Sequence, residues 1–199
     1  DSFHYLFRNE DHIAHLSLEN IYWMLTTLEF YNWHPMTWLS WAIDYQIYGG
    51  LESWGYHLSN NILHSINSAL VYILTLVVFG LNSSGSKTYS IATDNRSIIA
   101  ATLAAIVFAV HPQHVESVAW VAERKDLLCQ FWVILSILAY VQYVTSQETY
   151  KTRWFLVTSG FFTMAIISKP MAVSLPVLLL LIDIYPLRRT NLTRSSIQS

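Results

Sequence analysis

Ionisable residues are concentrated in one short stretch of an otherwise apolar sequence. This stretch contains Glu116, Glu123, Arg124, Lys125 and Asp126. An arginine or lysine here could hold an anionic head group, while a neighbouring carboxylate accepts a proton or orients a hydroxyl. The same residues could also form a solvated loop with internal ion pairs, because exposed pairs contribute little to stability. The residue types alone leave both interpretations open.

Two polar motifs each follow a short apolar stretch. The motif His-Pro-Gln-His-Val-Glu at 111–116 follows 95–110, and Ser-Lys-Pro at 168–170 follows 153–168. Each apolar stretch holds sixteen residues, which as a helix reach roughly 24 Å against a hydrocarbon core of about 30 Å. Both motifs should therefore lie below the outer membrane surface. Non-helical backbone at that depth must line a cavity or be covered by protein, so we expect a recessed polar cavity that opens outward.

A polar stripe is expected on another apolar stretch, 57–80. Asn60, His64 and Asn67 recur at spacings of four and three residues, which places them on one face of a helix. Hydrogen bonds between helices are the favoured interpretation of this face, and contact with a substrate is the alternative. His57 and His64 could instead bind a metal or haem, although no carboxylate lies beside them at the spacing of a zinc motif.

The elements that must position these residues are membrane helices. The chain of 199 residues is 53% hydrophobic and only 12% charged, a composition outside the range of soluble domains. We predict an all-α integral membrane protein whose helices form a multi-span antiparallel bundle. The five expected spans are 57–80, 95–110, 127–145, 153–168 and 171–187.

The charge distribution predicts the orientation of this bundle. Seven of the eleven Lys and Arg residues fall on one side of the expected spans, and the positive-inside rule makes that side cytoplasmic. All eight His lie on or toward the other half, so we expect the chemistry to face outward. Residues 1–54 then form an outer loop, 55–190 the bundle and 191–199 a polar cytoplasmic tail, in a single incomplete domain.

The outer loop is expected to contain interfacial helices. Ser17 can cap an amphipathic helix that lies flat on the membrane. A second helix should begin at Pro35 and end at Gly49-Gly50. Its aromatic residues are expected to form a belt at headgroup depth and to have no catalytic role. They are Trp38, Trp41 and Tyr45.

Four motifs occur in a recognisable order along the chain. They are Tyr-Asn-Trp-His-Pro-Met-Thr-Trp-Leu-Ser at 31–40, Gly-Tyr-His-Leu at 55–58, the sequence at 111–126, and Ser-Lys-Pro at 168–170. In these motifs the chain resembles the transmembrane and tetratricopeptide-repeat O-mannosyltransferase family in its prokaryotic form, over nearly its whole length. The resemblance implies the C-type glycosyltransferase fold, and we expect the chain to be a fragment without the first span and the repeat region.

The resemblance also implies a reaction. A polyprenyl- or dolichyl-phosphate donor would pass its sugar, mannose in this family, to Ser or Thr hydroxyls of an acceptor protein with inversion. The carboxylates expected to be catalytic are Asp1, as the general base, and Glu116. The cations expected at the donor phosphate are Arg124, Lys125 and Lys169. The residues expected to position sugar or acceptor are His34, His111, His114 and Asp126. No metal or other cofactor is required.

These expectations define the partners and the location. The partners are the donor lipid, an acceptor protein and the bilayer, whereas nucleic acid is not expected because a net charge of −2 gives no basic surface. The membrane is the plasma membrane of a bacterium or archaeon, or the endoplasmic reticulum of a eukaryote, with the active site on the outer or lumenal face. The alternatives are a polytopic transporter with an outward-facing polar cavity and an inactive membrane scaffold for a repeat domain.

Overall fold

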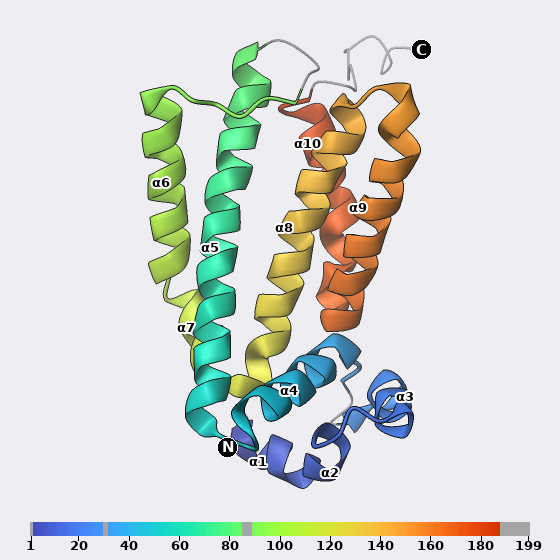
Figure 1. Ribbon diagram of the computed structural model, residues 1–199. Helices are drawn as coiled ribbons and strands as arrows, with labels where there is room; N and C mark the ends of the chain where they lie inside the picture. Colours follow the sequence, from blue (N-terminus) through green and yellow to red (C-terminus); the bar gives the residue numbers. More distant parts are fainter. Residues whose placement is uncertain (1, 30–31, 85–88, 188–199) are drawn as a thin grey trace, which may run out of the picture.

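The protein consists of a bundle of long helices with a layer of short helices under one end (Figure 1). The computed structural model describes residues 2–29, 32–84 and 89–187. The layer is formed by α1 (Ser2–Arg8), α2 (Glu10–Ile13), α3 (Leu18–Thr26) and α4 (Pro35–Tyr48). The bundle is formed by α5 (Ser53–Ser84), α6 (Asn95–Val110), α8 (Arg124–Thr145), α9 (Glu148–Ser168) and α10 (Leu175–Ile184). Short helices adjoin the bundle at α7 (Gln113–Ala119), η2 (Val121–Glu123) and η3 (Pro170–Ser174).

The bundle has the length and apolarity of a membrane protein. Within the described part of the chain, Ser53–Leu81 and Val121–Thr145 are each long and apolar enough to cross a membrane. The pair α6 and α7 meets the same criteria as one span that bends by 60° at its break. The predicted all-α membrane architecture is therefore confirmed.

Two of the expected spans differ from the helices of the structure in an informative way. Helix α9 begins at Glu148 and has 21 residues, roughly 31 Å, so the helix begins before the apolar stretch expected at 153–168. Its first turn is polar, with Lys151 paired to Glu148, and a sequence window chosen for apolarity misses such a turn. The stretch expected at 171–187 divides into η3 and the ten-residue α10.

The break between α6 and α7 has a local cause. Helix α6 has the sixteen residues expected and ends at Val110. Pro112 follows, and it lacks a backbone N–H and disfavours helical conformation in the residue before it. His111 accordingly has extended backbone, and α7 begins again at Gln113.

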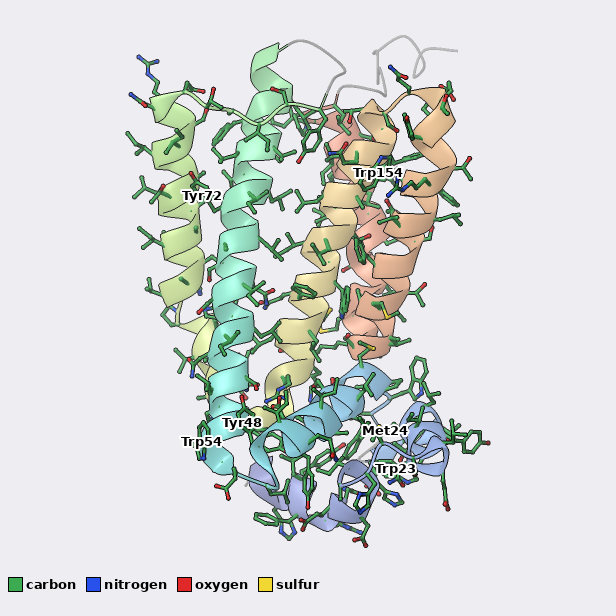
Figure 2. All side chains as sticks on the ribbon, viewed as in Figure 1. Trp23, Met24, Tyr48, Trp54, Tyr72 and Trp154 are labelled. Carbon is green, nitrogen blue, oxygen red and sulfur yellow. The ribbon has the colours of Figure 1, made fainter. Side chains whose placement is uncertain are left out.

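The outer layer has its own aromatic core. Trp38 and Trp41 are both 0% exposed and pack with Leu6, Ile13, Tyr56 and Val121. The expectation that they form a belt at headgroup depth was wrong, because helices α1 to α3 cover one side of α4 and the bundle covers the other. Trp23 of α3 meets Trp38 edge-on, with 4.9 Å between ring centroids, and Met24 beside it is buried (Figure 2).

The capping signals of the outer layer act as predicted. The Ser17 hydroxyl accepts a hydrogen bond from the Asn20 N–H at 3.1 Å and begins α3. Helix α4 begins at Pro35 and ends before Gly49, which has the left-handed conformation with φ of 75°. Leu18, Tyr22 and Leu25 form an exposed stripe on α3, as expected for a helix on a membrane surface.

Candidate active site

Two lysines from distant parts of the sequence line one cavity at the outer-layer end of the bundle. We call it the lysine cavity, and its volume is about 230 Å³. Lys125 comes from the first turn of α8 and Lys169 from the residue after α9. The remaining lining residues precede α4 or adjoin Lys169. They are Asn32, Trp33, His34, Ser168, Pro170 and Met171. Three of the sequence motifs thus meet here.

The local fold explains how these groups converge. Helix α9 ends at Ser168 because Pro170 opens the short helix η3, which leaves Lys169 extended between the two. Pro35 opens α4 directly after His34. The N-terminal end of α4, which carries partial positive charge, therefore adjoins the cavity that the two lysines line. Three elements thus contribute to the cavity.

Each lysine has one carboxylate partner and remains partly accessible. The Lys125 ammonium lies 3.0 Å from Glu123, and Lys169 forms an ion pair with Asp126. The exposed fractions of the two lysine side chains are 19% and 25%. An ammonium group has three N–H donors, so a single carboxylate contact leaves capacity for a bound anion.

His34 is a buried wall of this cavity. It is 4% exposed, and burial lowers its pKa to about 4. The hydrogen bond to the Asn32 carbonyl opposes this shift, whereas the Lys125 charge adds to it. The ring is therefore neutral near pH 7. Nδ1 lies 3.2 Å from the Asn32 carbonyl and must donate to it, so Nε2 accepts from the Tyr5 hydroxyl at 3.4 Å. Its orientation is fixed from both sides.

Arg124 lies outside the lysine cavity, in a buried network. It is 2% exposed, and its Nη1 lies 2.5 Å from the Asp44 carboxylate. Its Nε donates to Asn60 Oδ1 at 2.7 Å and its Nη2 to the Tyr56 carbonyl at 2.8 Å. All three nitrogens are used to join α8 to α4 and α5. The expected contact of Arg124 with the donor phosphate stays a prediction. Arg124 does not line the cavity that contains Lys125, the residue directly after it.

Asp44 is the buried partner in this network that sequence reasoning missed. It is 5% exposed in α4 and also accepts a hydrogen bond from the Ser59 hydroxyl at 2.9 Å. The available signal was a single carboxylate within a helix rich in aromatic and aliphatic residues. A charge in such surroundings requires a partner, but the sequence does not indicate which one.

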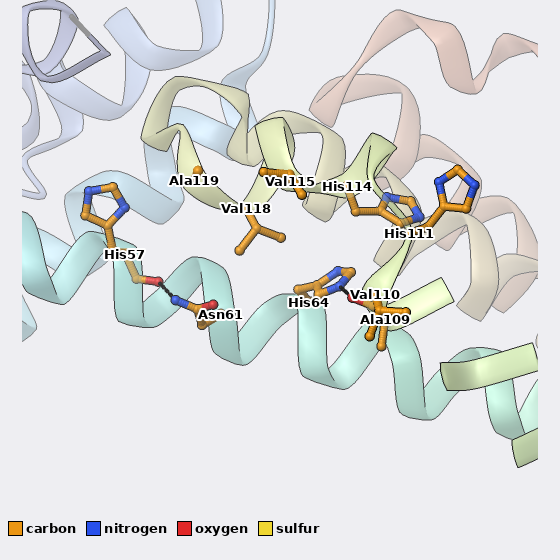
Figure 3. Close-up of a pocket in the computed structure, with 10 residues that line it drawn as sticks. All are labelled: His57, Asn61, His64, Ala109, Val110, His111, His114, Val115, Val118 and Ala119. Carbon is orange, nitrogen blue, oxygen red and sulfur yellow. Dashed lines mark hydrogen bonds between the residues drawn. The ribbon is translucent and has the colours of Figure 1, made fainter. Parts of the chain in front are cut away.

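A second cavity contains the histidines and shares no residue with the lysine cavity (Figure 3). This histidine cavity has a volume of about 500 Å³ and lies between α5, the end of α6 and α7. The ring centroids of His64 and His114 lie 5.5 Å apart, and those of His111 and His114 lie 6.0 Å apart. His111 and His114 are thus not placed with Lys125 and Lys169. In the described residues, no three His, Cys, Asp or Glu are arranged to hold a metal ion.

The remaining predicted carboxylates are separated from one another. Glu116 is exposed on α7 and lines neither cavity, whereas Asp126 is held at the lysine cavity by Lys169. Asp1 lies outside the described residues. The ionisable residues at 116–126 therefore lie in three different places. Glu116 is on an exposed surface, Arg124 is in a buried network and Lys125 is in the wall of the lysine cavity.

The polar stripe on α5 is a set of interhelical hydrogen bonds, as predicted. Asn60 donates to the carbonyls of Val118 and Trp120 at 3.2 and 3.3 Å. His64 Nε2 donates to the Ala109 carbonyl at 3.0 Å, and Asn67 donates to the Leu127 carbonyl at 2.9 Å. The stripe holds the ends of α6, α7 and α8 against α5.

Sequence comparison identifies relatives that share part of this chain. It is 40% identical to the protein O-mannosyl-transferase TMTC4 of Homo sapiens over 109 residues, which are 55% of the chain and 14% of the relative. It is 31% identical to Tmtc2 of Drosophila melanogaster over 134 residues, 67% of the chain and 13% of the relative. The protein O-mannosyl-transferase TMTC2 of Homo sapiens is 30% identical over 128 residues, 63% of the chain and 13% of the relative.

The matched region is a small part of each relative. The chain covers 13 to 15% of the length of the similar TMTC2 and TMTC4 proteins. No protein-family model matches the chain. No solved structure matches it.

Proposed function

This chain is related to the TMTC protein O-mannosyl-transferases, and from that premise we propose that it is the donor-binding part of a membrane glycosyltransferase. The enzyme transfers mannose from a polyprenyl- or dolichyl-phosphate donor to Ser or Thr hydroxyls of an acceptor protein. The observation that supports this proposal is the lysine cavity, where Lys125 and Lys169 face the same space as the N-terminal end of α4.

The two lysines neutralise the donor phosphate. In the reaction the acceptor oxygen forms a bond to the anomeric carbon, the bond from that carbon to the phosphate oxygen breaks, and the configuration inverts. The lipid phosphate departs with the electron pair, and its charge is stabilised by donors already in place. Two ammonium groups supply that stabilisation, so we propose that no metal ion or other cofactor takes part.

A carboxylate base accepts the hydroxyl proton, a contribution of about 10²–10⁴ in rate. We assign this role to Asp1 on the strength of the family resemblance. Glu116 is less suited to it, because it lines neither cavity. Asp126 positions Lys169 through their ion pair, and His34 forms a fixed neutral wall for the sugar.

The proposed site faces the outer or lumenal side of the membrane. The lysine cavity lies at the end of the bundle that carries α1 to α4, whereas Arg96, Lys151 and Arg153 lie toward the opposite end (Figure 1). The positive-inside rule makes that opposite end cytoplasmic. We propose a plasma membrane in a bacterium or archaeon and the endoplasmic reticulum in a eukaryote.

The test is a set of lysine variants in the full-length protein. Lys125→Ala and Lys169→Ala should each raise the KM for the lipid-phosphate donor about tenfold or more, because a hydrogen bond to a charged group contributes about 1.5–3 kcal/mol. The KM for a Ser/Thr peptide should stay unchanged. Lys151→Ala is the matched control, since Lys151 pairs with Glu148 at the other end of α9.

The possible outcomes distinguish a wrong donor-binding site from a wrong enzymatic activity. Donor KM values equal to that of the Lys151→Ala control would show that the lysine cavity does not bind the donor phosphate. Absence of transfer by the wild-type enzyme, with either polyprenyl- or dolichyl-phosphate mannose, would contradict the proposed activity itself.

A further inference from the structure

The lysine cavity is lined by two chemically different groups of residues. Lys125 and Lys169 supply ammonium groups from the bundle, whereas Trp33 and His34 supply aromatic rings from the segment before α4. Both groups line one space of about 230 Å³. A phosphate held by the two lysines therefore leaves the rings to contact whatever is attached to that phosphate.

The two rings have already used their hydrogen-bonding groups. The Trp33 indole N–H donates to the Leu25 carbonyl of α3 at 2.8 Å, and an indole has no other hydrogen-bonding group. The His34 ring nitrogens lie 3.2 Å from the Asn32 carbonyl and 3.4 Å from the Tyr5 hydroxyl. Trp33 thus offers a ligand a large apolar ring surface, and its hydrogen bond to α3 holds that surface in place.

This ring surface suits a sugar better than a lipid chain. A hexose carries its hydroxyl groups around the edge and C–H groups on its faces, so one face can pack on an aromatic ring without leaving a hydroxyl unpaired. The donor phosphate carries both a sugar and a lipid. The lipid must run toward the membrane-spanning bundle, whereas Trp33 belongs to the outer layer that precedes α4. The sugar is therefore the group that extends toward Trp33.

We propose that Trp33 packs against the sugar ring of the donor and makes the protein bind the glycosylated lipid in preference to the free lipid phosphate. This inference rests on the proposed function, because it places the donor phosphate at Lys125 and Lys169. The lysines contact a group that the donor and the lipid product share, whereas Trp33 contacts the group that is transferred. The lipid product loses the Trp33 contact after transfer, which favours its release.

The test measures the dissociation constants of two lipids for the full-length protein. Dolichyl-phosphate mannose carries the sugar, and dolichyl phosphate does not. Trp33→Leu removes the ring and keeps an apolar side chain. Trp54→Leu is the matched control, since Trp54 is 61% exposed at the start of α5 and does not line the lysine cavity. Lys169→Ala provides the comparison for the phosphate contact.

The expected result is a loss of preference for the mannosylated lipid. Trp33→Leu should raise the Kd for dolichyl-phosphate mannose about tenfold, because the sugar loses its aromatic contact, and leave the Kd for dolichyl phosphate unchanged. Lys169→Ala should raise both values, and Trp54→Leu should change neither. Trp33→Phe keeps an aromatic face but cannot donate to the Leu25 carbonyl, and it should retain most of the preference.

Fluorine NMR gives a second readout, which decides the matter if Trp33→Leu does not fold. In full-length protein labelled with fluorotryptophan, the Trp33 signal is identified by its loss in Trp33→Phe. This signal should shift with dolichyl-phosphate mannose and stay in place with dolichyl phosphate. Equal shifts with both lipids would overturn the proposal. Equal changes of both Kd values in Trp33→Leu, no change of either value, or a Trp33→Phe variant without the preference would overturn it as well.

Failure of the proposed activity would be visible separately, because binding requires no transfer. If the wild-type protein transfers no mannose but keeps a preference that depends on Trp33, the proposed activity is wrong and the sugar contact stands. If Lys169→Ala leaves both Kd values unchanged, the donor phosphate does not lie at the lysines, and the inference about Trp33 falls with that site.

Discussion

Arg124 and Asp44 form a buried ion pair that joins the outer layer to the bundle. Their burial means that the pair is costly to break, since a remaining partner keeps an uncompensated charge in an apolar region. Arg124 is also the first residue of α8 and directly precedes Lys125. The pair therefore connects α4 to the turn of α8 that carries Lys125.

We expect Asp44→Ala to lower the free energy of unfolding by about 3–5 kcal/mol, because it leaves the Arg124 guanidinium buried without a counter-charge. Unfolding of the purified protein in mixed micelles measures this change. Glu52→Ala is the control, since Glu52 is exposed in the same outer region, and it should stay within about 0.5 kcal/mol of wild type. Equal stability of the two variants would mean that the ion pair contributes nothing to the folded state.

His34 should make the stability depend on pH. Burial lowers its pKa from 6.5 to about 4, so between these values the unfolded chain binds a proton that the folded protein does not. Stability is therefore complete above pH 6.5 and falls as the pH is lowered toward 4. The total loss is about 3 kcal/mol.

The measurement for His34 is the melting temperature between pH 7 and pH 4. His34→Gln should remove a large part of the pH dependence, because glutamine does not titrate in this range. His15→Gln changes an exposed histidine and should retain the wild-type pH profile. If the melting temperature depends on pH identically in the wild type and in His34→Gln, His34 is protonated equally in the folded and the unfolded protein.

Helix α5 organises the elements around it through polar side chains. Asn60 contacts the carbonyls of Val118 and Trp120, where α7 meets η2, and it also accepts from Arg124. The neighbouring Asn61 instead donates to the His57 carbonyl on its own helix at 2.9 Å. Adjacent asparagines thus have different structural roles, and only one of them connects helices.

This difference predicts the effect of two matched substitutions. Asn60→Ala should lower the free energy of unfolding by about 1–3 kcal/mol, because the buried Arg124 Nε loses its acceptor. Asn61→Ala should have an effect of less than about 0.5 kcal/mol. Both can be measured by unfolding in the same micelles, and a larger loss for Asn61→Ala would contradict the interhelical role of Asn60.

The whole molecule has two chemically different ends. The outer layer and both polar cavities lie at one end, while the connection before α6 lies at the other (Figure 1). The direction of the chain through the membrane therefore decides which compartment the lysine cavity faces.

Cysteine labelling in intact cells tests this orientation. In a Cys129→Ser background, Glu52→Cys should react with an impermeant maleimide and Thr93→Cys should not, because these exposed positions lie at opposite ends of the bundle. Thr93→Cys should react once the membrane is permeabilised. Labelling of Thr93→Cys alone in intact cells would reverse the orientation and place the lysine cavity in the cytoplasm.

The sequence by itself determined features that depend on near neighbours. The cap at Ser17, the start of α4 at Pro35, its end at Gly49 and the break before Pro112 all follow from backbone preferences within a few residues. The polar stripe on α5 also follows, since helical periodicity fixes which residues share a face. The all-α membrane fold needs only the length and apolarity of the stretches.

The tertiary structure decided which residues meet. Arg124 and Asp44 are 80 positions apart in the sequence, and helical periodicity cannot indicate their contact because it depends on how α4 crosses the start of α8. The burial of Trp38 and Trp41 depends likewise on the helices that cover α4. Packing also separated His111 and His114 from Lys125, although all three belong to the motif at 111–126, because the bend after α6 directs α7 toward α5 while α8 begins beside α9.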